Sequence, residues 1–391
     1  MMDNFDIEVE KVNTSIPEGA KIKAIGVGGG GGNMINHMIS EGVGGIDLIV
    51  ANTDAQALDT SLAPYKIQLG LNATRGLGAG MMPEKGREAA LESFDEIKAM
   101  LAGADIVFIS AGMGGGTGTG AAPIVAQAAK EAGALTVSVV TSPFKFEGRK
   151  RSKLAKLGLE ELKRESDSIV IVPNEKLLSI VEKNLGIKES FRLVDDVLSQ
   201  AVGGISNVIL SHGPNDINLD FADVRTVMSH RGLALMGAGK SIGAGAAHDA
   251  AKTALESPLL DNISISGAMG VLVHFHIHPD YPILEISKAM EIVEENADED
   301  ASVIFGTTTN PNMEPDEVRI TIVATGFDDP NSLASEQAKK ANEASSLLKS
   351  NTSANAPIQP TLQQSRRVVG GYDATNEDLL DVPTFLRKQM D

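Results

Sequence analysis

The sequence predicts an α/β fold, in which a mostly parallel sheet domain is followed by a long helix and a smaller α+β domain. Three observations lead to this prediction. Apolar runs typical of strands buried on both faces alternate with helical stretches over 21–188, as in a parallel sheet covered on both sides. A helical pattern that is apolar nearly all round follows from Ser190 to Leu210, as expected of a helix buried between two domains. Beyond it, short strand patterns enclose two helical stretches.

The elements of the first domain follow the alternating order that a parallel sheet requires. Pro83 begins one helix, with Glu84 near its positive end. Ligands of such sheets bind at the carboxyl ends of the strands, and the glycine loops of this domain all fall at that edge. Strands are predicted over 21–27, 46–51, 66–69, 105–110, 135–140 and 168–172, and helices over 34–40, 83–101 and 121–132, after 151 and from 174.

The smaller domain has a different texture. A helix over 220–229 precedes it, and shorter strands then alternate with helices, which indicates an α+β arrangement. Its strands are predicted over 233–236, 271–277, 302–305 and 318–324, and its helices over 244–256 and 283–296.

The most informative stretch is Gly112-Met-Gly-Gly-Gly-Thr-Gly-Thr-Gly120, which lies between a predicted strand and a predicted helix. Glycine lacks the Cβ atom that would block close approach of a ligand, and it tolerates positive φ. Successive backbone N–H groups can therefore turn toward one point, while the helix N-terminus adds partial positive charge. We expect this loop to bind phosphate, using Gly114, Gly115, Gly116 and Gly118 and, on the same rim, the hydroxyls of Thr117 and Thr119.

An earlier loop carries the dinucleotide fingerprint Gly26-x-Gly28-x-x-Gly31, and Asp54 lies near the place where such folds put a carboxylate for the ribose. A nicotinamide-dependent oxidoreductase is therefore an alternative. A third glycine loop, 76–80, counts against it, because a dinucleotide fold needs one phosphate loop. Gly237-Ala-Gly-Lys-Ser241 ends like a P-loop, but the first glycine of that motif would fall at Ala234, inside a predicted strand.

Two residue pairs suit the rest of a nucleotide. Phe191 and Asp195 lie four apart on the long helix and share a face, so a ring could lie against a purine. The carboxylate could accept from N1–H and the 2-amino group of guanine, a donor pair that adenine lacks. Glu147 suits ribose hydroxyls and Arg151 suits phosphate. The plainer alternatives are a core Phe with a surface Asp, beside the second carboxylate Asp196, and an exposed charged helix start.

The stretch Asn218-Leu-Asp220-Phe-Ala-Asp223 is the candidate for chemistry. Asp220 can cap a helix, with Asp223 in the first turn near its positive end, and this structural role explains both residues. The two carboxylates could also polarise an attacking water. Because the stretch follows the long helix, it is expected at the end far from the nucleotide. Hydrolysis would then require the pocket of a second molecule.

Composition excludes several classes of function. Acidic residues outnumber basic ones by 52 to 34, giving a net charge of −18, so the chain is not steered to nucleic acid or anionic lipid. There is no Cys for disulfides or thiolate metal sites. We expect no signal peptide at the N-terminus, and no uninterrupted apolar run approaches the ~20 residues of a membrane span, so we expect a cytoplasmic protein without direct membrane insertion. His274, His276 and His278 alternate on one strand face, which we interpret as solvated or interfacial rather than as a metal site.

Both ends of the chain differ from the domains. Residues 1–20 form an acidic arm that we expect to be disordered, and 327–374 form a polar linker rich in Ser, Ala, Asn and Gln. Residues 375–391 contain an apolar cluster flanked by Arg387 and Lys388, and we expect them to dock into a partner's groove. A frayed end is the alternative for this segment.

The chain resembles the FtsZ family, bacterial division GTPases of the tubulin-like superfamily. The resemblance rests on Gly114-Gly-Gly-Thr-Gly-Thr-Gly120, a signature highly specific to that superfamily, and extends over about 21–326. Further anchors are 28–33, Asn52-Thr-Asp54, Phe146-Glu-Gly148, 218–225 and the tail Val382-Pro-Thr-Phe-Leu-Arg387.

The resemblance implies a GTP-binding domain over 21–188, a central helix and catalytic loop over 189–220 and a C-terminal domain over 221–326, with Mg²⁺ accompanying GTP or GDP. It implies that Asn218, Asp220 and Asp223 enter the pocket of the next subunit and promote hydrolysis there. Subunits would stack head to tail into filaments at the division site, on the inner face of the membrane, with the tail reaching membrane-tethering and regulatory division proteins. The implied nucleotide contacts are Gly29, Gly30, Gly31, Gly32 and Asn33, then Gly116, Thr117 and Gly118, and finally Glu147, Arg151 and Asp195.

The chain departs from the family pattern after Gly80. The family commonly has an Asn before the Pro there, whereas this chain has Met81-Met82. We therefore expect only the backbone of the Gly80 loop to serve the terminal phosphate.

Overall fold

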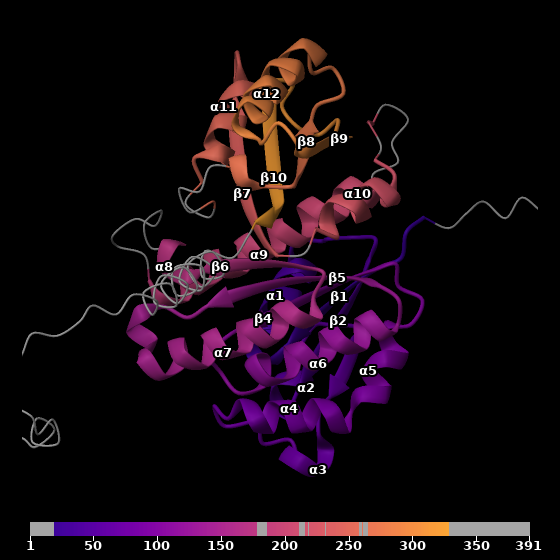
Figure 1. Cartoon of the computed structure of the whole chain (residues 1–391), viewed down its shortest axis with the longest axis vertical. Coiled ribbons are helices and arrows are strands. Elements are labelled where there is room, and N and C mark those ends of the chain that lie inside the picture. Colours follow the sequence, from indigo (N-terminus) through magenta and orange to yellow (C-terminus); the bar gives the residue numbers. More distant parts are fainter. Residues whose placement is uncertain are drawn as a thin grey trace, which may run out of the picture. The chain divides into compact units, whose positions relative to one another are not determined.

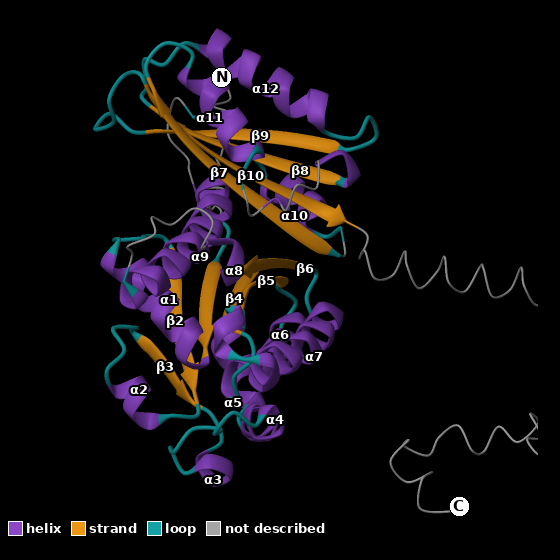
Figure 2. Ribbon diagram, turned by 90° about the vertical axis from the view of Figure 1, so that its left-hand side faces the viewer, coloured by secondary structure: helices purple, strands orange, loops and turns teal. Residues whose placement is uncertain are grey.

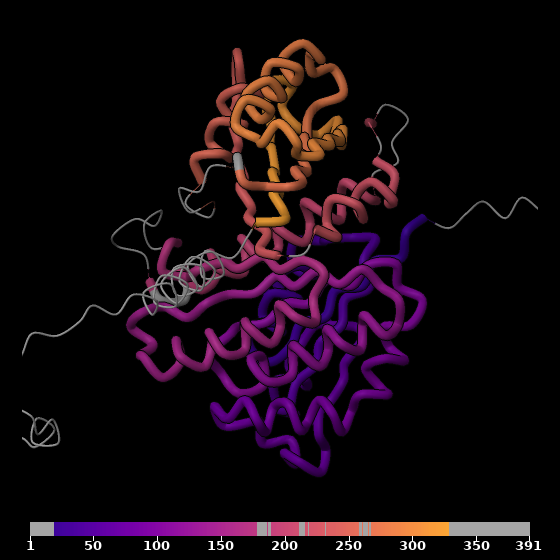
Figure 3. The backbone as a smooth tube through the Cα atoms, in the orientation of Figure 1, coloured from indigo at the N-terminus to yellow at the C-terminus, as the bar shows by residue number. Residues whose placement is uncertain are grey.

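The computed structural model describes residues 19–327, apart from 178–185, 211–215, 218, 231, 258–259 and 261–264. Several predictions from the sequence lie outside these residues: most of the N-terminal arm, the linker, the partner-binding peptide and Asn218. Figure 3 follows the described chain from indigo at its start to yellow near residue 327.

The structure is built on a ten-stranded sheet with the order β3-β2-β1-β4-β5-β6-β7-β10-β8-β9 (Figure 1). The strands from β3 to β7 pair in parallel, as the alternating apolar pattern predicts. Only β10 is antiparallel to its neighbours β7 and β8. The strands are β1 (Ile22–Val27), β2 (Ile46–Asn52), β3 (Tyr65–Gln68), β4 (Ile106–Gly112), β5 (Leu135–Ser142), β6 (Ser168–Pro173), β7 (Leu233–Ile242), β8 (Gly270–Ile277), β9 (Ser302–Thr309) and β10 (Glu317–Phe327).

Helices cover both faces of the sheet (Figure 2). Short 3₁₀ turns, η1 (Lys145–Glu147) and η3 (Ile265–Gly267), precede α7 and β8. The helices are α1 (Gly28–Ser40), α2 (Ala55–Asp59), α3 (Leu71–Thr74), α4 (Pro83–Glu92), α5 (Phe94–Leu101), α6 (Thr117–Glu131), α7 (Arg149–Glu165), α8 (Asn174–Leu177), α9 (Ile187–Leu210), α10 (Phe221–Met228), α11 (Ala246–Leu255) and α12 (Ile283–Asn296).

Alternate residues of the parallel strands enter different cores, because successive side chains point to opposite faces of a strand. Ala24 of β1 and Phe108 of β4 face α1 and α9, whereas Ile25 of β1 and Ile109 of β4 face α4, α5 and α6. A third core joins α11 and α12 to the face of β7, β8 and β10. The inner strands β1 and β4 are therefore apolar on both faces, which is the pattern the sequence shows, whereas the edge strand β3 is partly exposed.

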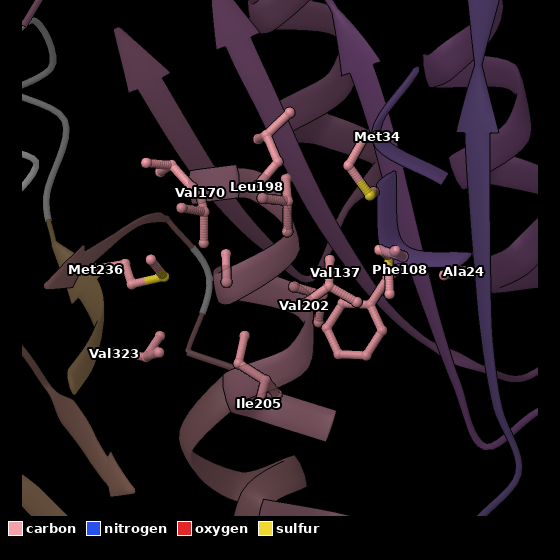
Figure 4. Packing of buried hydrophobic residues seen from close by; sticks show 14 of the residues in the cluster. Ala24, Met34, Phe108, Val137, Val170, Leu198, Val202, Ile205, Met236 and Val323 are labelled. Carbon is pink, nitrogen blue, oxygen red and sulfur yellow. The ribbon is translucent and has the colours of Figure 1, made fainter. Parts of the chain in front are cut away.

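Helix α9 is the predicted central helix, and it is buried as predicted. Ala201, Val202 and Ile205 are fully buried, and the same core holds Met236 of β7 and Val323 of β10 (Figure 4). Among the described residues, the stretch 189–210 of this helix is the one that has the length and apolar composition of a membrane span. Packing in the core explains that composition without a membrane, because α9 contacts β5 on one side and β8, β9 and β10 on the other.

Two helices begin earlier than predicted, inside the glycine runs. We expected helices from Met34 and Ala121, but α1 begins at Gly28 and α6 at Thr117. Low helix propensity is overridden here by packing that only glycine permits. A Cβ atom on Gly31 would lie 2.3 Å from the carbonyl oxygen of Ser110, and one on Gly120 would lie 1.9 Å from that of Pro83.

Two further boundaries differ from the prediction. The helix expected over 83–101 is broken at Ser93, whose hydroxyl accepts a hydrogen bond from Gly70 N at 3.1 Å. Strand β7 is longer than predicted and includes Gly237-Ala-Gly-Lys-Ser241, so this stretch is not a P-loop. A Cβ atom on Gly239 would lie 1.9 Å from the carbonyl oxygen of Ala250, so this glycine serves the packing of α11 on the strand.

Candidate functional site

A cavity of about 580 Å³ opens at the carboxyl ends of β1, β2, β4 and β5. This is the edge at which the glycine loops were predicted to meet, and its volume is in the range of small-molecule sites. All three loops contribute to it. Of the predicted contacts, those that line the cavity are Gly29, Gly30, Asn33, Asp54, Gly115, Gly116, Thr117, Gly118, Glu147, Arg151, Phe191 and Asp195.

The N-termini of α1 and α6 meet at one wall of this cavity. A Cβ atom on Gly28 would lie 2.9 Å from Gly118 N and 3.2 Å from Thr117 Cβ, so the close approach of the two helix starts requires glycine at position 28. Neither helix has a side-chain cap, so its first N–H groups are available to an anion. A Cβ atom on Gly29 or Gly115 would meet nothing within 4 Å, because these two glycines face open space. The wall suits a chain of phosphates.

Five predicted contacts do not line the cavity: Gly31, Gly32, Gly80, Gly114 and Thr119. Gly31 packs against the backbone of β4, and a Cβ atom on Gly114 would lie 2.8 Å from the carbonyl oxygen of Arg151. Thr119 is buried, and its hydroxyl accepts a hydrogen bond from Gly114 N at 2.8 Å, which holds the glycine loop in place. Gly31, Gly114 and Thr119 therefore support the wall rather than forming its surface, whereas Gly80 is exposed outside the cavity.

The third glycine loop brings a strained residue to the cavity. Met81 lines it with a φ of 58°, a left-handed conformation that residues other than Gly seldom adopt. Gly116 fits beneath this loop, since a Cβ atom there would lie 3.1 Å from both Met81 N and Met82 N. Strain of this kind costs about 1–3 kcal/mol and concentrates at functional sites.

The carboxyl end of β2 is tied to the start of α6. The hydroxyls of Thr53 and Thr117 lie 2.6 Å apart and share a hydrogen bond. Asp54 caps α2 by accepting from Gln56 N and Ala57 N while it also lines the cavity. Asp54 therefore has a structural role in addition to the predicted contact, and Thr53 is a supporting residue that sequence reasoning missed.

One end of the cavity is lined by aromatic and carboxylate side chains from α9. Phe191 is 40% exposed, and its ring meets that of Phe144 edge to face, with centroids 5.4 Å apart. Asp195 lines the same end. Burial, with a smaller contribution from the charge of Asp196, raises the pKa of Asp195 to about 7. A buried carboxylate of this kind is stabilised by a ligand that offers it N–H donors.

The neighbouring carboxylates of α9 have separate roles. Asp196 lies 2.6 Å from Nε2 of His37 on α1, which holds it against that helix. Asp195 is therefore the carboxylate that faces the cavity. The alternative of a surface Asp at position 195 does not hold, because the side chain lines the cavity and burial shifts its pKa.

Asn174 is a lining residue that sequence reasoning missed. It begins α8 directly after β6, at the edge where the glycine loops end. Its side chain is 5% exposed, and its buried Oδ1 atom has no hydrogen-bond partner within the described structure. Buried polar atoms usually have a partner, so this amide is suited to a polar ligand. Its position after a strand of the sheet was the signal, which we interpreted only as a helix start.

Glu147 and Arg151 form an ion pair at the cavity rim. Glu147 also accepts from Phe144 N at 2.9 Å, which fixes the carboxylate above the end of β5. Arg151 lies in the first turn of α7, so the charged-helix alternative and the site prediction both describe it. The pair presents an acceptor for hydroxyl groups beside a cation for phosphate.

Asp220 and Asp223 lie elsewhere. Asp220 is the N-cap of α10 and accepts from Ala222 N at 3.2 Å, as predicted, and both carboxylates are exposed. Helix α9 carries Asp195 near its start and ends at Leu210, a rise of about 22 Å at ~1.5 Å per residue. Asp220 and Asp223, here called the acid pair, follow that far end. The acid pair and Asp195 are therefore separated by most of the helix.

The alternating histidines, interpreted as solvated or interfacial, are buried or partly buried. His274 is only 4% exposed, hydrogen-bonds Thr308 Oγ1 at 2.8 Å, and has its pKa lowered to about 4, mainly by burial. It lines, with His276, a second cavity of about 430 Å³ between α9 and the C-terminal strands. The face is therefore not simply solvated. Among the residues that the structure describes, no group of three or more His, Cys, Asp or Glu could hold a metal ion.

Comparisons with known proteins place both halves of the described chain. Residues 21–182 match the model of the Tubulin/FtsZ family GTPase domain, and residues 232–328 match that of the FtsZ family C-terminal domain. The chain is 44% identical over 396 residues to the cell division protein FtsZ of Helicobacter pylori, covering 100% of this chain and 98% of that protein.

Solved structures agree with these matches. An empty FtsZ dimer of M. jannaschii is similar with a TM-score of 0.74 and 46% identity, covering 78% of this chain and 88% of that chain. CetZ2 of Haloferax volcanii, solved as a GTPγS-bound protofilament, has a TM-score of 0.67, covers 83% of this chain and 99% of that chain, and at 21% identity shows the shared fold alone.

Proposed function

We propose, since this chain belongs to the FtsZ family of tubulin-like cell-division GTPases, that it assembles head to tail and hydrolyses GTP between successive copies. The chain carries the family's GTPase domain, which binds GTP and GDP. The proposal concerns how the active site is divided. One copy supplies the nucleotide cavity, and the next copy supplies Asp220, Asp223 and Asn218, the last of which lies outside the described residues.

The observation that carries this proposal is the separation of the cavity from the exposed carboxylates. The cavity suits phosphate, ribose and base, and its own carboxylates have other roles: Asp54 caps α2, Glu147 pairs with Arg151, and Asp195 suits the base. Asp220 and Asp223 are exposed at the start of α10, beyond the far end of α9. Such an arrangement is completed when the α10 end of one copy meets the cavity of another. A contact of this kind is heterologous, so it continues into a filament.

The division of labour follows from the groups present. The N–H groups at the starts of α1 and α6 hold the phosphates, and Asp195 and Asn174 hold the guanine. The neighbour's carboxylates orient a water and accept its proton as it attacks the terminal phosphate. Asp54 is the lining carboxylate that would hold Mg²⁺ beside the phosphates. Phosphate oxygens and water would supply the other ligands of the ion. When bound, that ion neutralises phosphate charge.

Dilution tests the shared site directly. The rate of phosphate release per molecule should collapse when the protein is diluted below the concentration at which copies associate, because an isolated cavity lacks the acid pair. Phosphate release is measured against protein concentration, with light scattering in GTP, GDP and EDTA as the parallel assay. A rate per molecule that stays constant on dilution would instead indicate a GTP-binding switch without filaments, and the shared site would be wrong.

Two glycines of the phosphate wall should respond oppositely to alanine. Gly29→Ala should keep or raise stability, by up to about 1 kcal/mol, because it adds a better helix former that meets no atom within 4 Å. It should weaken GTP binding, because the methyl enters the cavity. Gly31→Ala should lower stability severely, since its methyl would lie 2.3 Å from the Ser110 carbonyl oxygen.

Thermal unfolding and titration with a fluorescent GTP analogue measure both effects. Gly44→Ala is the control, because a Cβ atom there also meets nothing within 4 Å and Gly44 does not line the cavity. Equal losses of stability in Gly29→Ala and Gly31→Ala would contradict the assignment of the two glycines to ligand and packing.

The remaining proposals concern where the protein acts. We infer cytoplasmic filaments at the division site, on the inner face of the membrane, since the chain is a cell-division protein of this family. The peptide 375–391, beyond the described residues, would reach membrane-tethering and regulatory proteins through its apolar cluster. The acidic net charge argues against nucleic acid as a partner.

A further inference from the structure

We propose that Asp216 is a positioning residue for hydrolysis, because it fastens the segment that leads to the acid pair onto the edge strand β9. This inference rests on the proposed function, in which Asp220 and Asp223 act in the cavity of the next copy. Asp216 lies four residues before Asp220. Its Oδ1 atom accepts two hydrogen bonds from Thr309, one from the backbone N and one from Oγ1, each at 2.8 Å.

The neighbouring residue continues the attachment. Ile217 N donates to Thr307 Oγ1 at 2.8 Å, and Thr307 N donates to Ile217 O at 3.1 Å. Thr307 and Thr309 are two apart on β9, so their N–H groups point to the same side of the strand. That side is the outer edge of the sheet, since β9 is the last strand in its order and pairs with β8 on the other side. The segment therefore completes the hydrogen bonding of an otherwise open edge.

The segment from Asp216 to Asp220 approaches β9 closely, at a position where the strand has no side chain. That position is Gly306, where a Cβ atom would lie 3.2 Å from Ile217 O and 3.3 Å from Leu219 Cδ1. Leu219 then packs against the core that surrounds α9, and Phe221 does the same. The path from Asp216 to Asp220 is thus held at both ends, by hydrogen bonds at the start and by apolar contacts before the helix.

The rest of α10 has its own anchors. Val224, Val227 and Met228 are buried, and Thr325 Oγ1 donates to Val227 O at 2.6 Å. These contacts hold the helix body, whereas Asp220 and Asp223 lie in its exposed first turn. Loss of the hydrogen bonds of Asp216 should therefore leave α10 folded but allow its first turn, with Asp220 and Asp223, to shift. A shift of about 1 Å in a catalytic group can cost on the order of 100-fold in rate.

The test compares three variants of the full chain. Asp216→Ala removes both hydrogen bonds to Thr309, and at saturating GTP it should lower kcat by roughly tenfold to a hundredfold. Binding of a fluorescent GTP analogue should stay within twofold of wild type, because the cavity lies near the other end of α9. Asp216→Asn keeps an acceptor oxygen of the same size, and it should recover most of the rate. Asp249→Ala, an exposed carboxylate on α11, is the control and should match wild type.

Thr309→Val keeps the test decisive if Asp216→Ala folds poorly. Valine preserves shape and the backbone donor but removes the hydroxyl, so a smaller loss of kcat is expected. The losses of Asp216→Ala and Thr309→Val should combine to less than their product in the double variant, since both break one attachment. The positioning role would be overturned if the losses of kcat in Asp216→Ala and Thr309→Val multiplied fully in the double variant. An equal loss of kcat in Asp216→Asn and Asp216→Ala would overturn it too.

The inference and the proposed function fail in different ways. Wild-type kcat in Asp216→Ala, together with a large loss in Asp220→Asn, would overturn the role of Asp216 alone. Wild-type kcat in Asp220→Asn would instead overturn the shared site.

Discussion

Asp220→Asn is expected to lower GTP turnover by roughly 100- to 10,000-fold, the range in which a general base contributes, while leaving nucleotide binding at the wild-type level. Asparagine is the informative replacement because it caps helices as well as aspartate does. It can keep the hydrogen bond from Ala222 N at 3.2 Å and remove only the charge. Asp220→Ala should also abolish turnover, but it removes the cap at a further cost of about 1 kcal/mol in stability. Single-turnover phosphate release and analogue titration measure rate and binding separately.

A mixture of two inactive variants tests whether the site is shared. Asp220→Asn binds GTP but lacks the Asp220 carboxylate, whereas Asp195→Ala keeps that carboxylate but binds GTP weakly. In a mixed filament, the nucleotide held by the first variant meets the intact Asp220 of the second. Activity of the mixture should exceed the sum of the separate activities. Strict additivity at concentrations where both variants pellet together would count against catalysis between copies.

The fold could be predicted largely because its signals are local. Strands apolar on both faces, such as β1 and β4, indicated a covered parallel sheet, and the apolar surface of α9 indicated a helix buried between two parts of the protein. The starts of α1 and α6 could not be predicted, since glycine has low helix propensity and the compensating contacts come from distant segments. Gly31 against Ser110 and Gly120 against Pro83 are contacts of that kind.

The candidate site shows the same limit. A run of glycines indicated a phosphate wall, and Gly29 and Gly115 do face the cavity, but Gly31 and Gly114 are required by packing against backbone. Sequence alone does not distinguish a glycine that makes room for a ligand from one that makes room for a neighbouring strand. Likewise, the spacing from Phe191 favoured Asp195 over Asp196, but the partner of Asp196, His37 on α1, could not be predicted because it comes from a distant segment.

Asn174 was missed for a related reason. An Asn after a strand is usually a helix cap or a turn residue, and the sequence around it has no glycine or charge pattern. Its significance depends on the burial of Oδ1 at the same cavity that Asp195 lines, which is a tertiary property. The attachment of Asp216 to Thr309 is also tertiary, because it joins residues 93 positions apart.

The second large effect is expected at Asp195, whose pKa is raised to about 7 by burial and, less, by the charge of Asp196. The N1–H and 2-amino groups of guanine favour the ionised carboxylate, so bound GTP should lower this pKa. Binding then releases a proton wherever the free carboxyl is protonated. Affinity should therefore rise with pH, by about tenfold between pH 6 and pH 8, and level off above the free pKa.

Asp195→Asn isolates this effect from the titration of the phosphates. The amide cannot ionise, so the difference in pH dependence between wild type and variant reports the carboxylate alone. Affinity for GTP should fall by roughly 10- to 100-fold at pH 8, because one of two charge-assisted hydrogen bonds is lost and the other is weakened.

The same variant should gain affinity for xanthosine triphosphate. Xanthine keeps N1–H but carries a carbonyl at C2, which the amide nitrogen of asparagine can donate to while its oxygen accepts from N1–H. In wild type the carboxylate repels that carbonyl. A reversal of the GTP-to-XTP preference, measured by competition against one fluorescent analogue, would assign base recognition to this side chain. An unchanged preference, or a pH profile shared by wild type and variant, would mean that Asp195 does not contact the base and that its raised pKa reflects burial alone.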